Sequence, residues 1–144
     1  MQKLPHIYHV TSDALPDSNL KCSSHRLANI EVAPPEEFGG PGDHWSPETL
    51  FMSALSNCYI LSFKAVSKAL KLDWIDISCD SEGILDRAER TTRFVKVTNN
   101  VKLTIKDEDD REKAEKLLEK AEHICLVSNS INAELVLEFE ISVL

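Results

Sequence analysis

The residues from Phe38 to Leu70, FGGPGDHWSPETLFMSALSNCYILSFKAVSKAL, decide the fold of this chain. The stretch begins as a glycine-rich loop and continues as fifteen residues without a charge, Thr49 to Phe63. Ser46 can serve as the N-cap of a helix, with Pro47 at the first helical position, where its missing N–H costs nothing. The apolar residues that follow surround nearly the whole helix, which is typical of a helix enclosed on every side. We therefore expect a central core helix that carries Cys58.

A membrane-spanning helix is the alternative interpretation of this stretch. A span needs about twenty apolar residues, whereas the uncharged run has fifteen and is followed at once by Lys64, Lys68 and Lys71. No cationic start followed by an apolar segment marks a signal peptide at the N-terminus. We therefore expect a cytoplasmic protein that is not inserted in a membrane.

Length and charge limit the classes of function. A chain of 144 residues suits one domain, residues 1–144, with a core of its own. Sixteen Lys and Arg residues against twenty-four Asp and Glu residues give a formal net charge of -8. This negative charge argues against nucleic acid or an anionic membrane as a partner.

The four cysteines are widely spaced and form no CxxC pair: Cys22, Cys58, Cys79 and Cys125. In a reducing compartment such cysteines are free thiols, or one redox pair, rather than a disulfide framework. Cys22 and Cys79 are expected to be small core residues. Together with His44 and His123, Cys58 and Cys125 could bind zinc, but no tight ligand spacing supports a metal site.

The rest of the chain alternates between strand and helix patterns. Alternating apolar residues predict strands at 6–11, 26–33, 75–85, 95–105 and 133–144, with a bulge or turn at Asn99–Asn100. Asp107 is expected to open a second helix, because its acidic first turn suits the positive end of the helix dipole. The buried face of that helix is expected to include Cys125 and four residues at helical spacing: Ala114, Leu117, Leu118 and Ala121. This order of elements predicts an α+β fold, with helices packed on antiparallel sheet.

The central helix is more apolar than one subunit requires. A helix that is apolar on all sides needs cover on all sides, whereas helices packed on a sheet are covered by that sheet on one side only. We therefore expect a homodimer formed through this helix.

Four short motifs follow one another along the chain: PPEEFGG at 34–40, SPETLF at 46–51, a cysteine ten residues after Glu48, and AEHICLVSN at 121–129. In this order and at this separation they resemble the OsmC/Ohr family of thiol peroxidases, the osmotically inducible and organic hydroperoxide resistance proteins. The resemblance covers nearly the whole chain, from Arg26 to the last strand. It implies an OsmC-like fold, with antiparallel sheets around a long central apolar helix, in an intertwined homodimer whose two central helices cross.

The resemblance also implies roles for individual residues. Cys58 matches the peroxidatic cysteine, which attacks the O–O bond of a small organic hydroperoxide and becomes a sulfenic acid. Cys125 matches the resolving cysteine, which condenses with it to a disulfide that an external dithiol then reduces. Glu48 matches a glutamate that pairs with an arginine near the thiolate. The chemistry implied needs no cofactor.

Helix geometry adds a condition on Glu48. Ten residues of helix separate it from Cys58, which is about 15 Å along the axis. This is too far for direct contact within one helix. We therefore expect Glu48 to serve Cys58 of the partner subunit, so that a monomer would be inactive.

The chain departs from the family pattern at the catalytic arginine, where Asp17 or Leu20 stands. Desolvation in an apolar helix raises the pKa of a cysteine, so we expect some cation to replace this arginine near Cys58. The candidates are Lys21, His25, Arg26, His44 and His123. His44 and Arg26 are the predicted binding residues, and His44 is favoured because it lies in the loop that enters the helix.

The second cysteine motif differs as well. The family often has His three residues before this cysteine and Pro directly after it, where this chain has Glu122 and Leu126. The resemblance is therefore to a divergent OsmC-like protein. Two functions follow: a thiol peroxidase that uses Cys58 and Cys125, or a protein of weak or lost peroxidase activity whose dimer-interface pocket binds an apolar small molecule.

Overall fold

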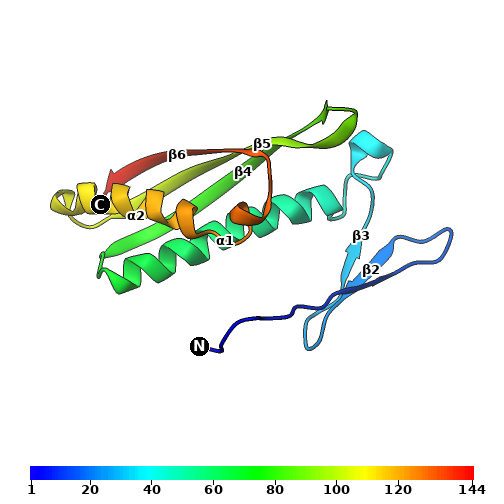
Figure 1. Cartoon of the computed structure of the whole chain (residues 1–144), viewed down its shortest axis with the longest axis horizontal. Coiled ribbons are helices and arrows are strands. Elements are labelled where there is room, and N and C mark those ends of the chain that lie inside the picture. Colours follow the sequence, from blue (N-terminus) through cyan, green and yellow to red (C-terminus); the bar gives the residue numbers. More distant parts are fainter. The chain divides into compact units, whose positions relative to one another are not determined.

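The uncharged stretch of the sequence forms helix α1, Pro47–Ala69, in the computed structural model, which describes all 144 residues (Figure 1). Ser46 caps the helix as predicted: its hydroxyl accepts a hydrogen bond from the Thr49 N–H at 3.1 Å. In return the Ser46 N–H donates to the Thr49 hydroxyl at 2.8 Å. Two N–H groups at the helix start are thus satisfied, which fixes the residue at which α1 begins.

One face of α1 is covered and another is not. The buried residues form a stripe along the helix: Leu55, Tyr59, Phe63, Val66 and Ser67. Leu61, by contrast, keeps 64% of its surface exposed. By length and composition α1 could also cross a membrane, but the core helix of a soluble protein meets the same criteria. A single subunit therefore provides only part of the cover that the sequence predicts for this helix.

The chain divides into two compact units, Met1–Phe51 and Met52–Leu144, and each is described by itself. In the first unit, β1 (Thr11–Asp13), β2 (Leu20–Ser23) and β3 (Ile30–Val32) form an antiparallel sheet in that order. The strand predicted at 6–11 is wrong, since β1 begins only at Thr11. The strand predicted at 26–33 is shorter because Arg26 has a left-handed backbone, with φ 62°, and lies in the turn before β3.

The motif after β3 folds back on itself. A 3-10 turn, Glu36–Phe38, is followed by Gly39 with φ 81°, a conformation that glycine adopts without strain. At Gly40 a Cβ atom would lie 1.6 Å from the carbonyl oxygen of Pro34, so only glycine fits there. Ala33 N–H then donates to the Trp45 carbonyl at 2.9 Å, which ties this loop to the residue before the helix cap.

In the second unit, β4 (Trp74–Ala88) and β5 (Thr91–Ile105) form a long antiparallel hairpin. Its two turn residues, Glu89 and Arg90, both have positive φ, as in tight hairpin turns. The bulge predicted at Asn99–Asn100 is wrong: the register shifts at Ile75 and Val95 instead. Asn99 stays in step with its apolar neighbours and is 2% exposed, because its side-chain oxygen accepts a hydrogen bond from the Ser81 hydroxyl.

The last strand corrects the predicted sheet. β6 (Glu134–Val143) runs parallel to β5, so the sheet β4-β5-β6 is mixed rather than wholly antiparallel. Helix α2 (Arg111–Ile124) begins after a 3-10 turn at Glu108–Asp110. It forms the crossover connection that two parallel strands require. The α+β class is confirmed.

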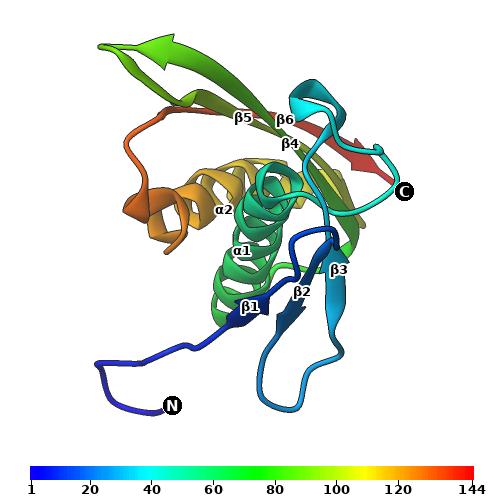
Figure 2. The same ribbon diagram turned by 90° about the vertical axis from the view of Figure 1, so that its right-hand side faces the viewer.

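Both helices of the second unit pack on one face of this sheet (Figure 2). Tyr59 and Phe63 of α1 meet Leu117 and Leu118 of α2 in the core, and the Tyr59 hydroxyl donates to the Leu118 carbonyl at 3.0 Å. The buried stripe predicted for α2 is confirmed. This packing brings the middle of α1 next to the end of α2.

Candidate functional site

The two cysteines singled out by the sequence lie together in the second unit. Cys58 is half-buried on α1, and Cys125 is fully buried at the residue that ends α2. Their thiols are within hydrogen-bonding reach of each other. A crossing of two helices has thus joined cysteines that are far apart in the sequence, and both are free thiols.

Hydrogen bonds distinguish the two thiols. Burial by itself raises the pKa of Cys58, but N–H groups of Val127 and Leu126 and the side chains of Cys125 and Ser62 outweigh it, so its pKa is lowered. Burial raises the pKa of Cys125, although the Ser128 hydroxyl donates to its sulfur at 3.2 Å. Because the thiolate is the reactive form, the lowered pKa favours Cys58 over Cys125 as a nucleophile.

A hollow of about 570 Å³ opens beside Cys58. Leu61 and Ala65 of α1 line one side, and Ile124 and Leu126 line the other. None of the lining residues is Lys, Arg or His. The surface next to the sulfur is therefore apolar and suits a hydrocarbon group better than a strongly hydrated one.

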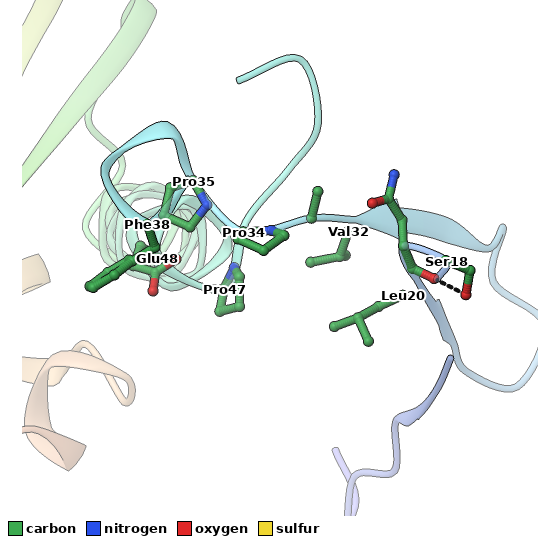
Figure 3. A pocket seen from close by; sticks show the side chains of 10 residues that line it. Ser18, Leu20, Val32, Pro34, Pro35, Phe38, Pro47 and Glu48 are labelled. Atoms are coloured by element: carbon green, nitrogen blue, oxygen red, sulfur yellow. Dashed lines mark hydrogen bonds between the residues drawn. The ribbon is translucent and has the colours of Figure 1, made fainter. Parts of the chain in front are cut away.

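Glu48 lies in the first unit, at the wall of a separate cavity of about 400 Å³ (Figure 3). The other walls are mainly apolar and include Leu20, Val32 and Phe38. The Glu48 Oε2 atom is buried and has no hydrogen-bond partner in the chain. Burying a carboxylate oxygen without a hydrogen bond costs free energy. We therefore expect this atom to accept a hydrogen bond from a donor outside the chain.

His44 and Arg26, the cations favoured by the sequence, each have surroundings of their own in the first unit. His44 lies between Asp43, at 2.5 Å, and Glu31, at 3.5 Å, and the hydrogen bond that its ring donates to the Asp43 carboxylate is the main cause of its raised pKa. Arg26 is exposed in the β2–β3 turn. Both belong to the first unit, so a role for either near Cys58 stays a prediction.

For the remaining candidates, too, a role near Cys58 stays a prediction. Lys21 pairs with Asp13 at 3.5 Å, and His25 is exposed. His123 is exposed on α2. Burial raises the pKa of Cys79, which suits the structural role predicted for it. No three metal-ligating side chains come together anywhere in the chain.

The groups that act most directly on the Cys58 sulfur cannot be recognised from residue types in the sequence. Peptide N–H groups leave no side-chain signal, so a search for cations overlooks Leu126 and Val127. Ser128, whose hydroxyl donates to the Cys125 sulfur, is also hard to find, because the chain leaves the helical path at Cys125 and spacing alone does not bring the two together.

The fold is a mixed sheet with two helices on one face. Two free thiols lie together where these helices meet, so the chain is an α+β protein with a pair of neighbouring thiols. Comparison with known proteins gives the family. The family model described as "OsmC-like protein" matches residues 40–140. The chain belongs to the OsmC-like family.

Relatives in this family include proteins of unassigned function. The uncharacterized protein YmaD of Bacillus subtilis is 30% identical over 124 residues, covering 84% of this chain and 81% of its own length. An OsmC-like protein of unknown function from Vibrio cholerae has the same fold, with a TM-score of 0.82, 19% identity, and coverage of 96% of this chain and 100% of its own.

Other relatives are described as resistance proteins. An organic hydroperoxide resistance protein OsmC from Legionella pneumophila is 26% identical, with a TM-score of 0.74 and coverage of 96% of this chain and 100% of its own. OsmC-like proteins are soluble, so α1 is a core helix of a soluble protein. The cytoplasmic location stays a prediction.

Proposed function

We propose that this protein is a thiol peroxidase that reduces small organic hydroperoxides through Cys58 and Cys125. The observation that carries the proposal is the contact of the two thiols, in which the pKa of one is lowered and that of the other is raised. Membership of a family that includes organic hydroperoxide resistance proteins agrees with it. The apolar hollow beside Cys58 supports an alkyl hydroperoxide as the substrate rather than hydrogen peroxide.

The reaction proceeds in three steps. The Cys58 thiolate attacks one oxygen of the hydroperoxide, the O–O bond breaks, and the released alkoxide takes up a proton to leave as an alcohol. The sulfenic acid on Cys58 is then attacked by the sulfur of Cys125, which forms the disulfide and releases water. An external dithiol returns both cysteines to thiols and is itself oxidised to a disulfide.

The proposal includes a homodimer. Glu48 and Cys58 are ten residues apart on α1, about 15 Å along the helix, so they cannot meet within it. The buried Oε2 atom of Glu48 still lacks a partner. A second subunit that supplies a donor to Glu48, and receives Glu48 beside its own cysteine pair, would satisfy both requirements.

A second candidate is favoured by the absence of Lys, Arg and His around the hollow. Without a nearby positive charge, the protein could bind an apolar small molecule at the dimer interface and turn over peroxide weakly or not at all. The two candidates differ in what Cys58 does when a hydroperoxide is added.

The test is consumption of cumene hydroperoxide in the presence of a dithiol reductant. Cys58→Ser should abolish turnover, and Cys125→Ser should greatly reduce it with a dithiol as reductant. Cys79→Ser is the matched control, because Cys79 is a half-buried thiol of the same unit outside the pair. Equal turnover by the wild type and Cys58→Ser would refute the proposal.

A further inference from the structure

Within the second unit, no positively charged side chain lines the hollow beside the Cys58 sulfur. The residues that line its hollow include no Lys, Arg or His. The titratable groups around the cysteine pair are Tyr59, Cys79 and Glu122, together with the two thiols themselves. None of these groups carries a positive charge in any protonation state. Within this unit, dipoles rather than a charged side chain are therefore available to hold a thiolate at Cys58.

The segment after α2 provides such dipoles. Cys125 ends the helix with an extended backbone, φ −64° and ψ 110°, so the chain leaves the helical path at this residue. The carbonyl groups of Cys125 and Val127 accept hydrogen bonds from the Asn129 and Ser130 N–H groups, at 3.0 Å each, which fixes the turn.

The N–H groups of Leu126 and Val127 have no backbone acceptor in this turn. Both act as hydrogen-bond donors to the Cys58 sulfur, and the Leu126 side chain lines the same hollow. Hydrogen bonds to an ionised acceptor are about twice as strong as those between neutral groups. Two such donors therefore favour the thiolate without any cation.

We infer that the peptide N–H groups of Leu126 and Val127 hold the Cys58 sulfur as a thiolate and replace the cationic side chain that such a nucleophile otherwise needs. The inference rests on the proposed function in one respect, since it concerns the cysteine named there as the nucleophile. It also gives the segment around the resolving cysteine two roles. The segment that carries Cys125 activates the sulfur that Cys125 later captures.

The structure allows these N–H groups to be removed by proline. Val127 has φ −69°, which is the value that a proline ring imposes. The extended conformation of Cys125 is also the one favoured before a proline at residue 126. Val127→Pro and Leu126→Pro each remove one donor, whereas Val127→Ala and Leu126→Ala keep the donor and remove side-chain atoms.

The first measurement is the rate of Cys58 alkylation by iodoacetamide against pH. Each proline variant should have a thiol pKa higher by about one unit than its alanine control, and so alkylate about tenfold more slowly below that pKa. Circular dichroism checks that the variants are folded. Identical pH profiles for the folded proline and alanine variants would overturn the inference and point to a charge from outside this segment.

A second measurement needs no change in the turn. In wild-type protein followed by NMR, the amide protons of Leu126 and Val127 should shift as Cys58 ionises, and Cys58→Ser should abolish this shift. Amide protons that do not respond to Cys58 would overturn the inference even if the proline variants fail to fold. Neither experiment uses a peroxide, so a protein with the expected thiolate and no turnover would refute only the proposed function.

Discussion

Glu122 shows how a single residue near the cysteine pair responds to its surroundings. It lies half-buried in the last turn of α2, and burial raises the pKa of its carboxyl group above the ordinary value of 4.5. A raised pKa in the folded state means that folding favours the protonated form. The stability that this provides is fully present below about pH 4.5 and is lost as the pH rises through the folded-state pKa.

Replacing Glu122 by Gln should therefore stabilise the protein at pH 7 and leave it unchanged at pH 4. The amide has nearly the same shape but no charge to desolvate, so the urea midpoint at pH 7 should rise modestly. Glu119→Gln, on the exposed side of the same helix, should leave the midpoint in place. A Glu122→Gln variant that is no more stable than wild type at pH 7 would contradict this assignment.

At the scale of elements, the sequence predicted those whose signals are local. The Ser46 cap, the apolar run of α1 and the stripe of α2 all follow from residues within one or two turns. The bulge predicted at Asn99 is wrong, because an asparagine in a strand pattern indicates an interruption unless its buried partner is known. That partner is Ser81 on β4. The parallel pairing of β6 depends on the path of the whole crossover and has no signal within the strand.

The start of α1 gives a prediction at this scale. Ser46→Ala removes the acceptor for the Thr49 N–H, and losing such a cap costs about 1 kcal/mol. The free energy of unfolding, measured in urea, should fall by this amount. Ser46→Thr keeps the hydroxyl and should lose clearly less. Equal losses in the two variants would show that side-chain volume, rather than the cap, sets the stability.

The cysteine pair itself was only partly predictable. The inward position of Cys125 followed from helical spacing, because seven residues separate it from Leu118. The cation expected near Cys58 stays a prediction, whereas the groups of the second unit that lower the pKa of Cys58 are peptide N–H groups and neutral side chains. Such donors depend on where a loop passes, which is set by the packing of α1 against α2.

For the whole molecule, the uncovered side of α1 is the feature that predicts a partner. Leu61, near the middle of the largely apolar helix α1, keeps 64% of its surface exposed. Burying a leucine side chain contributes about 1.5–3 kcal/mol of favourable free energy. A second subunit that covered this face would therefore be bound more tightly. The buried and unpaired oxygen of Glu48 is a second reason to expect one.

We predict that the protein is a homodimer and that one charged substitution at its interface dissociates it. Light scattering at micromolar concentration should give about twice the chain mass of 16.2 kDa. Leu61→Glu should give the mass of one chain, with helical circular dichroism retained, because the new carboxylate would be buried unpaired at the interface. Leu144→Glu, at an exposed C-terminal residue, should remain a dimer. A wild-type protein with the mass of one chain would contradict the dimer and the role of Glu48 across it.

The peroxidase chemistry is tested most directly by the intact mass of the reduced protein after one equivalent of cumene hydroperoxide. The proposed chemistry predicts the loss of two hydrogen atoms per chain, with peptide mapping that joins Cys58 to Cys125. Cys125→Ser should instead retain one oxygen on Cys58, seen as a sulfenic acid trapped by dimedone. A wild-type protein that stays fully reduced, or that forms its disulfide through Cys22 or Cys79, would contradict the account.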